Sequence, residues 1–360
     1  MKRILVTGAG GAAATNFTRS LRLVKDEQFH LIGVDADKYY LQRAETDERY
    51  LIPLCSDPDY LPIINDIVRE TGADLLFAQP DAEIECISTN REQIACRVFL
   101  ASKETVKICQ NKYLSFEKWK QAGLPVPDTM MIDNENDLHK AFREFGPKIW
   151  IRAVQGSFGK GSLPTDNVEQ AKAWLDFQKG WGNYSAAVCL LPESITWQSI
   201  WNNGELITAQ GRKRLYWEFA NRAPSGITGL TGTGVTISDP VLDELAQKAI
   251  HAIDPAPHGI FSVDMTYDVR GTPNPTEINI GRFFTTHLFF SVLGLNMPAI
   301  FVKLAFGEPL PAMPKKINPL PEGLAWVRGM DIEPVLTSLK DIEKEVLAME
   351  SRRNSLRARS

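Results

Sequence analysis

Short apolar runs alternate with helical patterns over the first hundred residues. Four runs have the length and apolar content of buried strands: residues 4–7, 31–34, 75–78 and 98–100. Three stretches carry apolar side chains at helical spacing: residues 12–23, 60–70 and 84–94. Strands separated by helical patterns of about 10–15 residues are typical of right-handed βαβ units around a parallel sheet. The pattern predicts a doubly wound first domain.

The pattern then changes toward antiparallel strands. The predicted elements are helices over 112–122 and 135–145, a strand over 148–152, strand-like runs over 186–191, 196–201, 205–209 and 212–217, a helix over 241–253, and strands over 259–267 and 275–280. Asn203-Gly204 lies between two of the runs and is a strong hairpin signal. Arg270-Gly271 marks a second turn. We therefore expect a mixed second domain with an antiparallel sheet.

The last fifty residues contain a proline-rich connector, a predicted strand over 324–328 and a predicted charged helix over 336–349. The arginine-rich end after this helix has no pattern of its own, and we expect it to be frayed.

Composition narrows the class of protein. The chain has 360 residues and a net charge of −4, and its acidic and basic residues are interspersed, which argues against nucleic acid as a partner. Its five cysteines form no C-x-x-C pair, which favours a reducing compartment. The first apolar run breaks at Gly8, and no apolar run reaches the roughly 18 residues of a membrane span. A cytoplasmic protein without a membrane partner is expected.

A first glycine loop, residues 8–13, follows a strand and opens a helix. It fits the dinucleotide fingerprint G-x-G-x-x-A, and Asp35 ends the next strand, where an acidic residue can hold a ribose. The alternative is a tight turn that needs small residues for helix–sheet packing. No tyrosine has a lysine four residues later, which disfavours a short-chain epimerase. An NAD(P)-dependent oxidoreductase or epimerase nevertheless stays an alternative.

A second glycine loop follows the cation Arg152 at the end of a strand. Its small and basic residues are Gly156, Ser157, Gly159, Lys160, Gly161 and Ser162. Such a segment can close over a polyphosphate, although it lacks the spacing of a Walker A loop. A flexible hairpin without a ligand is the alternative.

A third pattern combines carboxylates with an amide in apolar strands. Glu277 and Asn279 are two residues apart and share one face of a strand, and Asp264 lies beside them if the two strands pair as a hairpin. Oxygen ligands of this kind suit Mg²⁺, and the absence of a neighbouring histidine or cysteine disfavours zinc and iron. Surface charges on a hairpin are the alternative, but buried carboxylates without a cation are costly.

Together these motifs resemble the ATP-grasp superfamily, in the branch similar to the large subunit of carbamoyl phosphate synthetase. The resemblance covers about residues 1–310. Asp264, Glu277 and Asn279 match the family's metal ligands, and the segment 102–113 with the trailing Gly123-Leu124-Pro125-Val126-Pro127 matches its first lysine, here Lys112. Arg152 takes the place of the second cation. The adenine hinge matches Cys189, Leu190, Leu191, Pro192 and Glu193. The family's Glu-x-Asn-Pro-Arg is altered, because Arg282 comes one residue later.

The resemblance implies a fold with α/β and α+β parts. It implies a Rossmann-like pre-ATP-grasp domain over residues 1–103 and an ATP-grasp domain over 104–310, whose two α+β subdomains clamp ATP. The lid subdomain is expected over about 115–188, and residues 311–360 form a C-terminal strand and helix.

The resemblance also implies a function. The expected enzyme is an ATP-dependent ligase that activates a small carboxylate as an acyl phosphate, joins it to an amine-type acceptor and uses Mg²⁺ or Mn²⁺. Arg152 and Arg282 are the implied catalytic cations. Arg212 and Arg214 share a strand face and either help to bind substrate or form a solvated face. Carboxyphosphate or carbamoyl-phosphate chemistry and a non-catalytic nucleotide-binding subunit are further alternatives, and a homodimer is left open.

Overall fold

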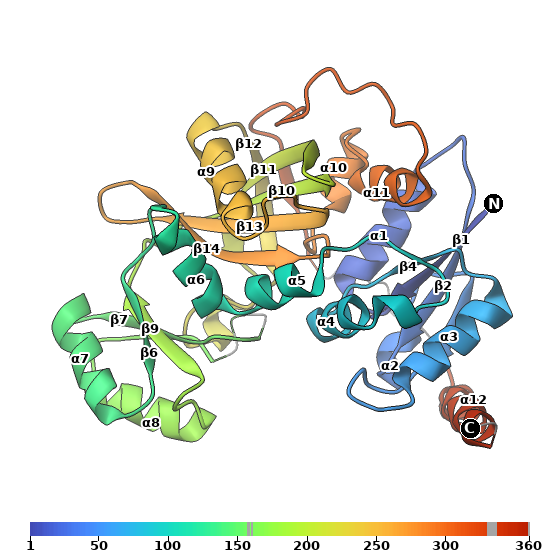
Figure 1. The fold of residues 1–360 in the computed structure, drawn as a ribbon, viewed down its shortest axis with the longest axis horizontal. Helices are drawn as coiled ribbons and strands as arrows, with labels where there is room; N and C mark the ends of the chain where they lie inside the picture. The colour runs from blue at the N-terminus through green and yellow to red at the C-terminus, as the bar shows by residue number, and fades with distance from the viewer. Residues whose placement is uncertain (157–158, 160, 330–336, 359–360) are drawn as a thin grey trace.

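The computed structural model describes residues 1–156, 159, 161–329 and 337–358, and these residues form three β-sheets with flanking helices (Figure 1). The first sheet has the order β3-β2-β1-β4-β5 with all pairs parallel, which confirms the predicted doubly wound arrangement. Its elements are β1 (Lys2–Thr7), α1 (Ala12–Arg22), β2 (Phe29–Asp35), α2 (Lys38–Leu41), β3 (Glu48–Leu51), α3 (Tyr60–Thr71), β4 (Leu75–Phe77), α4 (Asp81–Thr89), the 3₁₀ turn η1 (Arg91–Gln93) and β5 (Arg97–Val98).

The first glycine loop packs against its own domain. The Gly10 backbone N–H donates to Asp35 Oδ2 at 3.0 Å, so this carboxylate is already used within the loop. A Cβ at Gly10 would lie 1.8 Å from the Tyr40 carbonyl oxygen, and Gly8 has a left-handed φ of +57°. These contacts support the interpretation as a tight turn and disfavour the dinucleotide site.

A small antiparallel sheet of order β6-β9-β7-β8 lies at the opposite end of the molecule (Figure 1). It has its own apolar core, in which side chains such as Leu138 and Leu175 cover Ile149 and Ile151. Helices α5 (Lys103–Gln110) and α6 (Lys112–Gln121) lead to it, and its elements are β6 (Thr129–Ile132), α7 (Glu135–Phe145), β7 (Ile149–Ala153), β8 (Leu163–Thr165), α8 (Val168–Gln178) and β9 (Tyr184–Val188).

The central sheet is antiparallel throughout and has the order β14-β13-β10-β11-β12-β15. The predicted hairpin at Asn203-Gly204 is confirmed, with positive φ at both residues. The runs 205–209 and 212–217 are one strand, not two, because Gly211 stays paired with Trp197 and Ile237. The elements are β10 (Ser194–Asn202), β11 (Glu205–Trp217), the 3₁₀ turn η2 (Ala220–Arg222), β12 (Thr231–Ile237), α9 (Pro240–His251), β13 (Gly259–Tyr267), β14 (Pro273–Ile280), α10 (Leu288–Val292), α11 (Met297–Phe306) and β15 (Ala325–Val327).

The C-terminal helix α12 (Leu339–Arg357) lies beside the first domain (Figure 1). The expectation of a frayed end was wrong for residues up to 357, because arginines there pair with carboxylates around α3. Arg352 binds Asp66 at 2.5 Å, and Arg357 binds Asp59 at 2.6 Å. Neither α12 nor any other helix in the described part of the chain has the length and apolarity to cross a bilayer.

Two apolar clusters join the first sheet to the central sheet. One runs from Ile32 and Ile64 to Trp197 and Phe261, and the other brings α10 and α11 onto β1, α1 and β4. The central sheet therefore rests on the first domain, while the small sheet has a separate core. The predicted boundaries at residues 103 and 310 stay predictions.

We expect Gly10→Ala to lower the free energy of unfolding by about 1–3 kcal/mol, because the new methyl overlaps the Tyr40 carbonyl. Gly329→Ala is the control, since no atom of the described residues lies within 4 Å of its added Cβ. Urea unfolding measures both variants. NAD(P)H is expected to leave the thermal midpoint of the wild type unchanged, and a stabilisation that is lost in Gly10→Ala would restore the dinucleotide site.

Glu83, in the first turn of α4, is buried beside Thr7, Asp35 and Tyr60. Burial raises its pKa from 4.5 to about 7, and the nearby Asp35 carboxylate adds to the rise. Between these values the folded chain keeps a proton that the unfolded chain loses, so the free energy of unfolding falls as pH rises through this window.

Glu83→Gln removes this titration. Relative to the wild type, the variant should gain up to about 3 kcal/mol at pH 8 and little at pH 4. Urea unfolding as a function of pH measures the difference, with the exposed Glu85→Gln as the control. Parallel pH profiles for wild type and Glu83→Gln would contradict the assignment.

Candidate functional site

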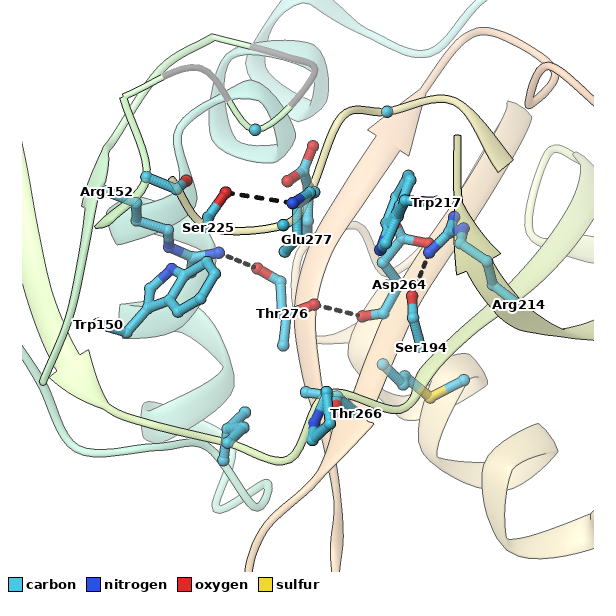
Figure 2. A pocket seen from close by; sticks show the side chains of 18 of the residues that line it. Trp150, Arg152, Ser194, Arg214, Trp217, Ser225, Asp264, Thr266, Thr276 and Glu277 are labelled. Carbon is cyan, nitrogen blue, oxygen red and sulfur yellow. Dashed lines mark hydrogen bonds between the residues drawn. The ribbon is translucent and has the colours of Figure 1, made fainter. Parts of the chain in front are cut away.

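A cavity of about 630 Å³ lies between the central sheet and the small sheet (Figure 2). It collects most of the residues that the sequence singled out. Ser157 and Lys160 lie outside the described residues, and Gly161 does not line the cavity. The predicted residues that do line it are Lys112, Arg152, Gly156, Gly159, Ser162, Cys189, Leu190, Leu191, Glu193, Arg212, Arg214, Asp264, Glu277, Asn279 and Arg282.

The acidic centre of the cavity is the β13–β14 hairpin. Asp264 and Glu277 are register partners, as the predicted pairing across the Arg270-Gly271 turn requires. Asp264 accepts hydrogen bonds from the Thr196 hydroxyl at 2.5 Å and from Asn279 Nδ2 at 3.0 Å. The two carboxylates and the amide are half-buried, so the alternative of exposed surface charges is wrong.

Arg282 points into this centre despite its late position. Gly281, the extra residue, has φ +73° and donates its N–H to the Ile260 carbonyl at 2.8 Å, which turns the chain back toward the strand end. Arg282 then donates to Asp81 Oδ1 and Asn279 Oδ1, each at 2.6 Å. Burial alone would lower the pKa of Arg282, but the Asp81 carboxylate raises it above its ordinary value.

Two cations lie at the small-sheet side of Glu277. Lys112, the first residue of α6, is 3.7 Å from Glu277 Oε2 and donates to the Gly156 carbonyl at 2.6 Å. Arg152, on β7, donates to the Thr276 carbonyl at 3.1 Å. Burial lowers the pKa of Arg152, and Glu277 opposes this shift. Helix α6 and strand β7 therefore present positive charge to one end of the cavity.

The described glycines of the second loop serve different contacts. A Cβ at Gly159 would lie 2.5 Å from the Ile227 carbonyl, so this glycine lets the loop approach the segment between β11 and β12. Gly161 instead packs on Tyr184, and its carbonyl accepts from Trp174 Nε1 at 3.0 Å. Gly161 therefore anchors the loop to the small sheet, and its predicted contact with ATP stays a prediction.

The predicted adenine hinge also lines the cavity, but part of its backbone is already hydrogen-bonded to β13. The Leu191 N–H donates to the Tyr267 carbonyl at 2.8 Å, and the Leu191 carbonyl accepts from the Thr266 hydroxyl at 2.6 Å. Glu193 is ion-paired with Lys213 at 2.6 Å. The Leu191 backbone N–H is thus already engaged within the fold.

Arg212 and Arg214 lie at the other end of the cavity (Figure 2 shows Arg214). They are only 1% and 8% exposed, so the alternative of a solvated strand face is wrong. Burial lowers the pKa of Arg212 well below its ordinary value, and Arg214 adds to this effect. Burial also lowers the pKa of Arg214 to about 10, although Asp264 and Glu277 oppose the shift.

Sequence reasoning missed two residues that organise the site. Thr196 joins Arg212 to Asp264, because its hydroxyl accepts from Arg212 Nη2 at 2.8 Å and donates to Asp264. Asp81 reaches the site from the first domain through Arg282. Its signal was its place just after β4, since ligand sites of doubly wound sheets lie at the carboxyl ends of the strands. A threonine within an apolar strand gave no comparable signal.

No protein-family model matches the chain. Among curated proteins, the glutamate–LysW ligase ArgX of Sulfolobus acidocaldarius is 24% identical over 98 residues, which are 27% of this chain and 35% of that protein. The match thus spans about a third of the relative's length.

Similar solved structures cover far more of the chain. The biotin carboxylase domain of 2-oxoglutarate carboxylase from Hydrogenobacter thermophilus, in complex with Mg-ADP and bicarbonate, gives a TM-score of 0.68 at 17% identity, over 90% of this chain and 73% of that one. Carboxyaminoimidazole ribonucleotide synthase from Aspergillus clavatus, in complex with ATP, gives 0.64 at 13% identity over 99% of both chains. The likeness confirms the expected ATP-grasp fold.

We expect Thr196→Val to lower the free energy of unfolding by about 1–3 kcal/mol, because the isosteric methyl leaves Arg212 and Asp264 without their shared hydroxyl. Thr196→Ser keeps the hydroxyl and is expected to lose less. Urea unfolding compares the two variants. Equal losses would mean that Thr196 contributes through its methyl group alone.

Proposed function

We propose that the protein is an ATP-dependent ligase, which activates a small carboxylate as an acyl phosphate and joins it to an amine or similar nucleophile. One observation carries the proposal. A single cavity holds two carboxylates and an amide, with cations on both sides: Lys112 and Arg152 at one end, Arg212 and Arg214 at the other. Such a site can bind a polyphosphate at one end and an anionic substrate at the other.

The relatives support this chemistry. By their names, they include a glutamate–LysW ligase, a biotin carboxylase domain with Mg-ADP and bicarbonate, and a ribonucleotide synthase with ATP. A small-molecule carboxylate and an amine-type acceptor are the substrates that we infer for this chain. A cytoplasmic location and a homodimer stay predictions.

The donor set fits a divalent cation. Among the described residues no group of three or more His, Cys, Asp or Glu side chains forms a metal site. Asp264, Glu277 and Asn279 offer only two carboxylates and an amide, a set that suits Mg²⁺, or Mn²⁺ in its place, with phosphate oxygens as further ligands. The cation would neutralise charge on the β- and γ-phosphates.

The chain's own residues then have distinct tasks. Lys112 and Arg152 bind phosphate oxygens and balance the charge that develops during transfer. A carboxylate oxygen of the substrate attacks the γ-phosphorus, the bond to the β-phosphate oxygen breaks, and ADP leaves. The amine next attacks the acyl carbon, loses a proton and displaces phosphate. Arg282 is fixed by Asp81 and Asn279, and its role would be to hold the reacting carboxylate and its acyl phosphate.

Two other functions differ from this one in testable ways. Bicarbonate as the carboxylate would give carboxyphosphate by the same first step, and the bicarbonate-bound neighbour keeps this second candidate open. An oxidoreductase needs the first glycine loop, but Asp35 is hydrogen-bonded to that loop and the cavity is not lined by it.

We expect ADP formation to require a divalent cation and Glu277→Gln to lower its rate by about 10²-fold or more, since losing a charged ligand costs about 3 kcal/mol in the transition state. ADP release is measured with a panel of carboxylates, bicarbonate and hydroxylamine as a general nucleophile. Glu205→Gln, exposed on β11 and remote from the cavity lining, is the control. Full activity in excess EDTA would contradict the metal assignment, and no ADP with any carboxylate would contradict the ligase.

A further inference from the structure

Arg212 and Arg214 have an unusual set of partners. Arg212 donates to the Thr196 and Thr286 hydroxyls, and Arg214 donates to those of Ser194 and Thr231. Within the described part of the chain, neither guanidinium forms an ion pair with a carboxylate. Two neighbouring cations are thus buried with only neutral hydrogen-bond partners, an arrangement that is unfavourable until an anion joins them.

The two guanidinium groups are also held in fixed planes. Arg214 stacks on the Trp217 ring at 3.5 Å, and Arg212 lies 4.2 Å from the centre of the Phe284 ring. The Nε of Arg212 is buried and has no hydrogen-bond partner among the described residues. Oriented, desolvated forks of this kind match the two oxygens of a carboxylate or a phosphate.

The phosphates of ATP do not account for this charge. Figure 2 shows Arg152 and Arg214 at opposite ends of the pocket, with Glu277 and Asp264 between them. Lys112 lies at the same end of the pocket as Arg152, since it contacts Glu277 and the Gly156 carbonyl of the glycine loop. Arg282 is neutralised by Asp81, and Lys148, directly before β7, is exposed. Among the described lining residues, Arg212 and Arg214 are therefore the buried cations left for another ligand.

We propose that the substrate whose carboxylate is phosphorylated carries a second anionic group, a carboxylate or a phosphate, and that Arg214 and Arg212 bind this group. The inference rests on the proposed function and narrows its substrate to dianions. The second group takes no part in the chemistry. It places the substrate so that its other end, the reacting carboxylate, faces Arg282 and the γ-phosphate.

The test traps the acyl phosphate with hydroxylamine, so the natural acceptor need not be known. The nitrogen of hydroxylamine attacks the acyl carbon, loses a proton and displaces phosphate, which leaves a hydroxamate that is quantified with ferric iron. Substrates with two anionic groups, called dianions here, are compared with isosteres in which one of the groups is a neutral amide: succinate with succinamate, glutarate with glutaramate, and L-glutamate, which also carries an ammonium group, with L-glutamine. 2-Phosphoglycolate tests a phosphate as the second group, and butyrate and bicarbonate are the monoanions.

We expect at least one dianion to give a kcat/KM about 10-fold or more above that of its isostere, because the amide of the isostere leaves the buried arginine charge unpaired. Arg214→Gln should remove this preference by raising KM for the dianion, with KM for ATP unchanged within about twofold. Arg214→Lys should restore it in part, since lysine supplies charge without the fork. Arg270→Gln, exposed at the β13–β14 turn, is the matched control.

Three outcomes would overturn the inference. If monoanions react as well as dianions, the ligase stands and the second anionic group is wrong. If Arg214→Gln raises KM for ATP instead, the pair binds phosphates of the nucleotide. If no carboxylate supports ADP release in the wild type, the proposed function fails, and the inference fails with it.

Discussion

The site depends on burying charged groups inside an antiparallel sheet, where hydrogen bonds link one group to the next. A chain of contacts runs from Arg212 through Thr196 to Asp264, and on through Asn279 and Arg282 to Asp81. Each group forms a hydrogen bond with the next. The polar network therefore helps to fix the register of β11, β10, β13 and β14, together with the apolar core. Because Asp81 belongs to the first domain, the same chain links that domain to the acidic centre.

Most of the fold followed from periodicity, and the exceptions have physical reasons. Strands β13 and β14 and helix α7 begin or end within two residues of the prediction, because their apolar spacing is regular and their turns are marked by glycine or a capping side chain. Strand β11 was divided in two at Gln210-Gly211, where only pairing with both neighbouring strands keeps the chain extended. The last turns of α12 are held by carboxylates near α3, a tertiary contact that no local pattern reports.

The two glycine loops explain why a glycine motif alone did not separate a packing turn from the candidate site. In the first, the Tyr40 backbone packs directly against Gly10, and Asp35 accepts from the loop itself. In the second, Gly156 and Gly159 line a cavity whose opposite wall carries carboxylates. The spacing of the glycines in the sequence indicated a conformationally free backbone in both loops. What lies opposite each loop is set by the fold, and the carboxylate hairpin was the sequence feature that separated them.

Strand order also arranges the chemistry in space. The acidic residues are on β14 and β13, the linking hydroxyl of Thr196 is on β10, and Arg212 and Arg214 are on β11. Strand β11 lies two strands away from β13, and the single Thr196 hydroxyl separates the Arg212 guanidinium from Asp264, on the side away from Arg152. That separation suits a short molecule with an anionic group at each end. A sheet that placed both pairs of cations on one strand could neutralise phosphate but could not hold a second substrate at a fixed distance from it.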